Sequence, residues 1–221
     1  MIPTNWYGAL NAAMNAQALH SSKTKLLDAA LTVIRTKGYS ATTVDDICHE
    51  AGVTKGSFFH HFKSKDELAL AAAQHFSDMA DGLFAQAPYH APSDPAERVL
   101  GYIDFRADML KWQIPQYTCL LGTMVQEAYS SHPAIREACE RQLTGHAATM
   151  AGDIAGALAA TGRSHDFTPE SLALHIQAVL QGAFVLAKAT GGAEVAVDSL
   201  GHLRRYLTWL FETDIPREEA A

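Results

Sequence analysis

The 221-residue sequence predicts an all-α protein of nine to ten helices. Apolar residues recur at the three- and four-residue spacing of amphipathic helices over most of the chain, and no segment shows the alternation of a strand. Prolines and glycines stand where such helices would begin and end: Thr168-Pro169 favours a start, and Gly38 and Gly191-Gly192 favour stops. These observations favour helices packed on helices over any fold that contains a sheet.

The composition is that of a globular protein, with 48% hydrophobic and 19% charged residues. No apolar run reaches the length needed to span a bilayer, and no signal peptide pattern opens the chain, so we expect no membrane partner. Three widely spaced cysteines argue against a disulfide scaffold. The expected location is therefore the reducing cytoplasm.

Residues 1–20 include Trp6 and Tyr7 but no Lys or Arg. They therefore do not form a basic arm for the minor groove of DNA. Residues 9–19 could form a weak helix. We expect an N-terminal extension, to which the sequence assigns no role.

The first strong helix is predicted from Ser22 to Lys37, and Gly38 would end it. One face of this segment is apolar, so it can hold the two helices that follow. The apolar stripe consists of Leu26, Leu27, Ala30, Leu31, Val33 and Ile34.

Two short helices joined by a tight turn are predicted between residues 40 and 62. Thr43 can cap the first helix, because its hydroxyl can accept a hydrogen bond from a free backbone N–H. Gly52 supplies the backbone freedom that a helix stop and a sharp turn need. Thr54 can cap the second helix, Lys55–Phe62. This is the layout of a helix-turn-helix, whose second helix enters the major groove of DNA.

The same region carries a longer signature: Ala29-Ala30, Gly38-Tyr39, Thr42-Thr43-Val44, Ile47, Ala51-Gly52-Val53-Thr54-Lys55-Gly56-Ser57-Phe58, His61-Phe62 and Lys63-Ser64-Lys65-Asp66-Glu67-Leu68. In residue types and spacing, Thr24–Phe76 resembles the DNA-binding domain of TetR-family transcriptional regulators. The resemblance implies an all-α protein with an N-terminal helix-turn-helix domain of three helices and a helical C-terminal ligand-binding and dimerisation domain. One position departs from the pattern, since Phe59 stands where the family usually has a Tyr that touches a DNA phosphate.

By this resemblance, a set of residues on the two short helices would face double-stranded DNA. Lys55 and Ser57 are the best candidates for contacts with base edges, because they lie early in the second helix. Lys65 starts a helix, where its side chain and the backbone N–H can both hold a phosphate. Adjacent His60 and His61 diverge by about 100° around a helix and cannot readily chelate one ion, so we expect no metal and no cofactor. The full set is Thr43, Thr54, Lys55, Gly56, Ser57, His60, His61 and Lys65.

The formal net charge of −7 is unevenly distributed. Residues 21–68 hold seven basic and six acidic residues, a net charge of +1, whereas residues 69–221 hold ten basic and eighteen acidic residues, a net charge of −8. An acidic body would repel DNA and leave the near-neutral head as the docking surface. The mild acidity of most soluble bacterial domains explains the same numbers.

A longer helix is predicted to start at Ser64, with Glu67 completing a capping box, and to run to about residue 86. The Pro-rich segment 87–95 would end it. The later helices are expected at about 95–112, 116–129, 133–160, 169–190 and 196–213.

Three parts are expected: an N-terminal extension (1–20), a DNA-binding domain (21–68) and an effector-binding and dimerisation domain (69–221). The last two helices have broad apolar faces, which suit either an intramolecular core or a four-helix dimer interface. The family implies a homodimer, whose two-fold symmetry matches a palindromic operator. The apolar positions are Leu172, Ile176, Val179, Leu180, Ala183, Phe184, Val197, Leu200, Leu203, Leu207, Leu210 and Phe211.

The segment Tyr117–Glu127 contains Cys-Leu-Leu-Gly followed three residues later by Gln-Glu. It resembles the electrophile-sensing subset of the family that includes the N-ethylmaleimide-responsive repressor. The resemblance implies that Cys119 senses electrophiles or oxidants and that Lys188 can bond to it. A nearby ammonium would lower the pKa of the thiol from roughly 8.5 and raise the reactive thiolate fraction. A buried structural role for Cys119 stays open.

An effector pocket would draw on aromatic and Met side chains, which suit a small apolar ligand and equally a generic core. The sequence thus predicts a non-enzymatic repressor released from its operator by a thiol-reactive effector at Cys119, or by a reversibly bound apolar inducer. An enzyme using Cys119 lacks a catalytic motif, and an adaptor without DNA binding has only Phe59 in its favour. The candidate effector residues are Trp112, Tyr117, Cys119, Met124, Gln126, Tyr129, His146, Phe184 and Lys188.

Overall fold

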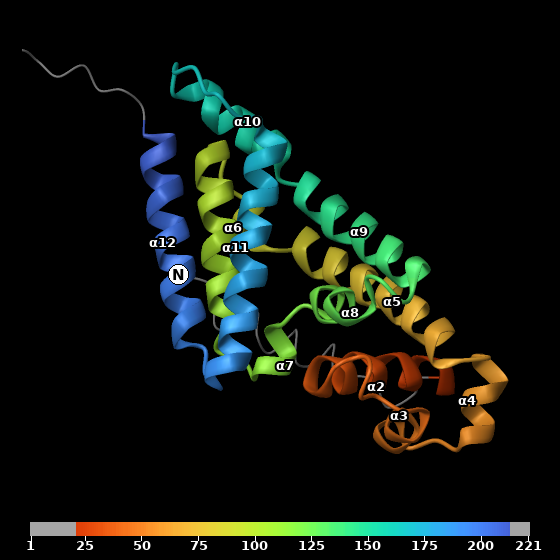
Figure 1. The fold of residues 1–221 in the computed structure, drawn as a ribbon. Coiled ribbons are helices and arrows are strands. Elements are labelled where there is room, and N and C mark those ends of the chain that lie inside the picture. The colour runs from red at the N-terminus through yellow and green to blue at the C-terminus, as the bar shows by residue number, and fades with distance from the viewer. Residues whose placement is uncertain (1–20, 213–221) are drawn as a thin grey trace, which may run out of the picture. The chain divides into compact units, whose positions relative to one another are not determined.

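The computed structural model describes residues 21–212, and every regular element in that range is helical (Figure 1). The predicted all-α fold class is therefore confirmed. The predictions for residues 1–20 lie outside the described residues. The chain divides into two compact units, one containing the helix-turn-helix and the other most of the C-terminal half.

The first unit comprises the chain up to Gly82 together with Leu120–Cys139. It contains the predicted DNA-binding domain (21–68), and it includes a segment distant in the sequence. Its core consists of side chains that are almost fully buried: Leu26, Ile34, Tyr39, Ile47, Phe58 and Leu68. Its helices are α2 (Ser22–Lys37), α3 (Val44–Ala51), α4 (Lys55–His61), most of α5 (Lys65–Ala85), α8 (Leu120–Ala128) and the start of α9 (Pro133–Ala148).

The second unit comprises Leu83–Cys119 and the chain from Glu140 onward. Helices α11 and α12 lie side by side, and α6 packs against α10 and α12 (Figure 1). The complete elements of this unit are the 3-10 turn η2 (Pro88–His90), α6 (Pro95–Met109), α7 (Ile114–Tyr117), α10 (Ala151–Ala160), α11 (Pro169–Thr190) and α12 (Glu194–Phe211).

Most apolar positions predicted on the last two helices face the unit's own core. Leu172, Ile176, Leu180, Leu203 and Leu207 are all buried. They are buried because α11 and α12 turn this face toward each other and toward α6 and α10. Val197 is the exception among the predicted positions: it is exposed, with other apolar side chains of these two helices that are described below.

Several predicted helix boundaries need correction. The predicted segment 133–160 is two helices, because Thr149 turns its hydroxyl to the backbone carbonyl of His146 at 2.7 Å and the helix ends at Ala148. The predicted segment 116–129 begins instead as α7, which stops at the extended residue Thr118. The bounds predicted for 169–190 are confirmed by α11.

Helix α11 also corrects the expectation that no segment is long and apolar enough to span a bilayer. Its 22 residues meet that requirement by length and composition. Eight of them are nevertheless buried inside the second unit. This pattern is that of a core helix, which passes the same composition test.

Candidate functional site

Capping interactions fix helix α3 of the helix-turn-helix. The Thr43 hydroxyl accepts a hydrogen bond from the Asp46 backbone N–H at 3.2 Å, and the Asp46 carboxylate accepts one from the Thr43 backbone N–H at 2.8 Å. The ammonium of Lys37 lies 2.8 Å from the Asp46 carboxylate. This charge and the hydrogen bonds from Thr43 hold the pKa of Asp46 well below its usual range. Gly52 ends the helix at φ +64°, a conformation that glycine adopts without strain. The predicted cap and stop are confirmed.

Helix α4 is held by one side chain and exposes most of the others. Thr54 caps it by accepting from the Ser57 backbone N–H at 3.2 Å, and Phe58 is fully buried. Lys55 and His60 are exposed. Phe59 is 57% exposed, so an apolar ring stands on the surface where the family usually has a phosphate-contacting Tyr.

Some predicted DNA contacts already have partners within the first unit. Lys55 pairs with Asp45 at 2.8 Å, a surface ion pair of the kind that contributes little to stability. His61 lies 2.7 Å from the hydroxyl of Ser22. Lys65 donates to the backbone carbonyls that flank the loop before α3, so its side chain stabilises that loop. The remaining positions, Thr54, Gly56 and His60, are exposed, and Ser57 is half-buried.

The loop that enters α3 is also held by α8, which sequence reasoning did not connect to it. The Glu127 carboxylate accepts a hydrogen bond from the Ser40 backbone N–H at 2.7 Å. Gly38 has φ +88°, and a Cβ added there would lie 2.3 Å from Oε1 of Glu127. Lys65 donates to the carbonyl oxygens of Tyr39 and Thr42 at 3.0 and 3.1 Å. The backbone before the helix-turn-helix is therefore fixed by side chains from two other helices.

A buried polar cluster lies inside the second unit. Nε2 of His146 lies 3.0 Å from the hydroxyl oxygen of Tyr102, and the Gln177 amide donates to that oxygen at 3.3 Å. Burial, helped by the charge of Arg106, lowers the pKa of His146 to about 4. His146 is therefore neutral at pH 7. Sequence reasoning found His146 but missed Tyr102, Arg106 and Gln177, whose only signal is a polar residue on an otherwise apolar helix face.

The structure brings together only some of the nine predicted effector residues. Tyr117 and Phe184 are in ring contact, with centroids 5.9 Å apart. Cys119 is half-buried and close enough to Tyr102 to influence its pKa, which burial raises. Trp112, His146 and the exposed Lys188 also belong to the second unit, whereas Met124, Gln126 and Tyr129 belong to the first.

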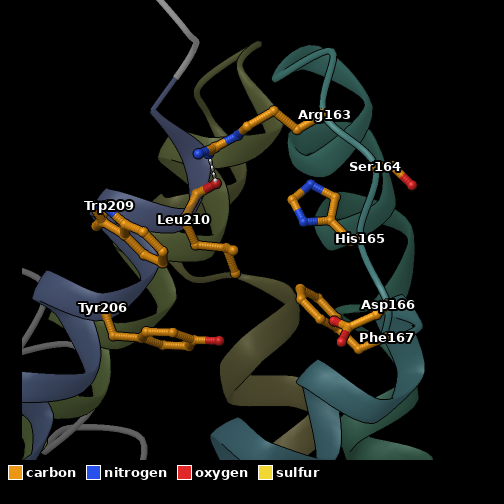
Figure 2. A pocket seen from close by; sticks show the side chains of 8 residues that line it. All are labelled: Arg163, Ser164, His165, Asp166, Phe167, Tyr206, Trp209 and Leu210. Atoms are coloured by element: carbon orange, nitrogen blue, oxygen red, sulfur yellow. Dashed lines mark hydrogen bonds between the residues drawn. The ribbon is translucent and has the colours of Figure 1, made fainter.

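An open groove of about 540 Å³ lies elsewhere in the second unit, between the loop after α10 and the end of α12 (Figure 2). Arg163 donates to the backbone carbonyls of Leu210 and Glu212 at 2.6 and 2.9 Å and so caps α12. None of the predicted effector residues lines this groove. Its lining consists of Arg163, Ser164, His165, Asp166, Phe167, Tyr206, Trp209 and Leu210.

Within residues 21–212, no group of three or more His, Cys, Asp or Glu side chains is placed to hold a metal ion. The cysteines differ in exposure: Cys48 and Cys139 are buried, and Cys119 is half-buried. Cys119 directly precedes the first residue of α8.

Two family profiles match the chain. That described as "Bacterial regulatory proteins, tetR family" matches residues 26–72, and that described as "Tetracyclin repressor-like, C-terminal domain" matches residues 95–203. The first falls on the helix-turn-helix and the second on α6 to α12.

Curated relatives share parts of the sequence. The chain is 38% identical over 81 residues to the transcriptional repressor KstR2 of Mycolicibacterium smegmatis, over 37% of this chain and 39% of that protein. It is 30% identical over 120 residues to the transcriptional regulator AcuR of Cereibacter sphaeroides, over 54% of this chain and 53% of that protein. The matched segments thus span roughly two fifths to one half of these relatives.

Solved structures share the fold over most of the chain. The reduced form of E. coli NemR aligns with a TM-score of 0.71 at 19% identity, over 84% of this chain and 96% of that one, which shows the fold alone. A TetR regulatory protein from Rhodobacter sphaeroides aligns with a TM-score of 0.73 at 27% identity, over 85% of this chain and 97% of that one. With the capped helix-turn-helix and both profile matches, these findings show that the chain belongs to the TetR family of helix-turn-helix transcriptional repressors, which are not enzymes.

Proposed function

We propose that this regulator is a cytoplasmic homodimer that binds a palindromic operator and leaves it when the second unit senses a small effector. The observation that carries the proposal is that one helix, α8, runs from Cys119 to the residue that holds the loop before α3. This helix begins directly after Cys119 and ends beside Glu127, whose carboxylate holds the loop that enters the helix-turn-helix. A change at Cys119 can therefore reach the DNA-reading helices along a single helix of nine residues.

Exposed apolar side chains on α11 and α12 support the homodimer. Of nine large hydrophobic side chains exposed among the described residues, six lie on these two helices. An apolar face of this kind is typical of an interaction surface, and two helices from each subunit can bury it as a four-helix bundle. The six are Leu174, Val185, Leu186, Val197, Tyr206 and Trp209.

A dimer presents two copies of α4, which supports binding to an inverted repeat. The test is selection of binding sites from random double-stranded DNA by the purified protein. We expect enrichment of a two-fold symmetric sequence, with affinity that falls steeply as salt rises, because phosphate contacts release counterions. Failure to enrich any sequence, or enrichment of a sequence without symmetry, would contradict the proposal.

We further propose that the effector is a thiol-reactive electrophile or oxidant acting at Cys119. In the case of N-ethylmaleimide, the thiolate sulfur adds to the alkene carbon, and the neighbouring carbon takes up a proton from water. The product is larger and uncharged, which changes the packing at the start of α8. Cys48 and Cys139 are buried and serve as internal controls.

The test compares operator binding before and after N-ethylmaleimide treatment for the wild type and for Cys119→Ser. We expect release of the wild type only, with mass spectrometry locating the adduct on Cys119. Release of both proteins, or of neither, would favour the alternative, a reversibly bound apolar inducer. Arg106 and its neighbours would be the place to look for such a ligand.

A further inference from the structure

We propose that Arg106 anchors an anion-binding subsite in the second unit, which takes the carboxylate of a small organic acid. The inference rests on the proposed function, since it assigns a chemical class to the reversibly bound inducer named there as the alternative effector. Three observations carry it: a cation without a carboxylate partner, a neutral polar cluster beside that cation, and two buried hydroxyls that lack hydrogen-bond partners.

Arg106 lies between two aromatic rings. Its Cζ atom lies 5.3 Å from the ring centroid of Phe84 and 5.3 Å from that of Phe184. Both distances are within the range of a cation–π contact, which leaves N–H groups of the guanidinium for hydrogen bonds. These N–H groups are the part of arginine that recognises a carboxylate with two parallel bonds.

The charge of Arg106 is not neutralised within the described residues. Two other arginines in the second unit have acidic partners: Arg98 lies 2.6 Å from Asp153, and Arg204 lies 2.6 Å from Asp104. No carboxylate between residues 21 and 212 forms an ion pair with Arg106. A half-buried cation without a counter-charge is unfavourable, and an anionic ligand would relieve this.

The groups beside Arg106 are neutral at pH 7. Burial lowers the pKa of His146 to about 4, and burial also raises the pKa of Tyr102 above its usual value. Tyr102 is within hydrogen-bonding range of both Arg106 and Gln177. These neighbours can orient a ligand but cannot supply the missing negative charge.

Two buried hydroxyls add hydrogen-bonding capacity in the same unit. Tyr117 is 3% exposed and Thr118 is 2% exposed, and neither hydroxyl has a partner among the described residues. The Tyr117 ring contacts Phe184, the same ring that covers Arg106. An unpaired buried hydroxyl costs about 1–3 kcal/mol, which a hydrogen bond to a ligand oxygen would offset. Aromatic rings around Arg106 supply apolar surface for the body of the acid.

The test measures binding of benzoate and phenylacetate to the full-length protein by calorimetry, each against its uncharged amide at constant ionic strength. We expect each acid to bind at least about tenfold more tightly than its amide, because hydrogen bonds to a charged group are the stronger ones. Arg106→Gln should lose this preference. Arg106→Lys should keep part of it, since the charge remains but the two-pronged geometry is lost. Arg205→Gln, which removes an exposed arginine of α12, should bind as the wild type does.

The proposal is overturned if neither acid binds the wild type, if acid and amide bind equally, or if Arg106→Gln binds the acids unchanged. Circular dichroism checks the fold of each variant. If Arg106→Gln does not fold, two measurements test the anion subsite in its place. They are the binding of the acids by Arg106→Lys and the comparison of acid with amide in the wild type. Operator selection is a separate measurement, so a protein that binds its operator but no acid overturns only the anion subsite.

Discussion

The two units use polar side chains in different ways. In the first unit, polar side chains near the surface fix the backbone of one loop: Glu127 holds Ser40, and Lys65 holds the carbonyls of Tyr39 and Thr42 on either side of it. In the second unit, polar side chains gather in the interior around Tyr102. There, among the residues described, Arg106 forms no ion pair with a carboxylate and the hydroxyl of Tyr117 has no hydrogen-bond partner.

This difference matches the demands on the two parts of a regulator. A DNA-reading unit needs one backbone geometry, and hydrogen bonds that are fully satisfied make a segment rigid. A sensing unit needs capacity for a ligand, and buried groups without partners store an unfavourable free energy that a ligand can relieve. The comparison predicts that changes in the first unit affect operator binding, and that changes in the second affect the response to ligands and to pH.

The largest expected effect tests the core of the first unit. Phe58→Ala should lower the free energy of unfolding by about 3–5 kcal/mol, because it empties the space of a fully buried ring. Phe59→Ala, at the neighbouring 57% exposed position, should change it by no more than about 0.5 kcal/mol. Urea denaturation measures both. Similar losses for the two variants would contradict the structure of α4.

The pH dependence of stability tests the interior of the second unit. In the folded protein, His146 has a pKa of about 4 and stays neutral down to that pH. In the unfolded chain, the same side chain takes up a proton near pH 6.5. As the pH falls from 6.5 to 4, proton binding therefore favours the unfolded state, by about 3 kcal/mol in total. Below pH 4 this loss levels off. The carboxyl of Asp46, whose pKa is lowered, does not contribute in this window.

The measurement is urea denaturation at a series of pH values. His146→Gln should flatten the profile between pH 6.5 and 4, and His60→Gln, at an exposed position of α4, should leave it unchanged. A profile that keeps its slope in His146→Gln would show that another group is responsible.

Much of the first unit could be predicted from the sequence because its signals are local. Thr43 and Gly52 each act within a few residues, so their roles as cap and stop follow from spacing alone. The bounds of α11 were predictable for the same reason, since Thr168-Pro169 and Gly191 mark its ends.

The polar cluster of the second unit could not be predicted, because its members come from distant parts of the chain. Tyr102 and Gln177 are 75 positions apart, and each is a polar residue among the buried apolar residues of its helix. The hydrogen bond from Ser40 to Glu127 spans 87 positions and was missed for the same reason. The motif around Cys119 lies at the start of a helix that the sequence did predict, within 116–129, but the contact of that helix with the DNA-binding loop was not predicted.

A smaller effect tests the loop before α3. Gly38→Ala should cost about 1–2 kcal/mol, because φ is +88° and the new Cβ would displace the Glu127 carboxylate. Operator affinity should fall as well, since an L residue is strained at this φ and the backbone that enters α3 must shift. Gly82→Ala is the matched control: it lies in α5 with open space around it, and should stabilise the protein by up to about 1 kcal/mol. Equal effects of the two changes would contradict the strained loop.

The smallest expected change in stability tests how the two units communicate. Glu127→Ala removes one exposed hydrogen bond and should cost no more than about 1 kcal/mol. Operator binding without N-ethylmaleimide should therefore persist. The release that N-ethylmaleimide causes should weaken by about fivefold or more, because the proposed coupling ends at this bond. Gln126→Ala is the control, since that side chain donates to the Gly122 carbonyl of its own helix. If Glu127→Ala is released as fully as the wild type, the signal does not pass through Glu127, and α8 only supports the loop.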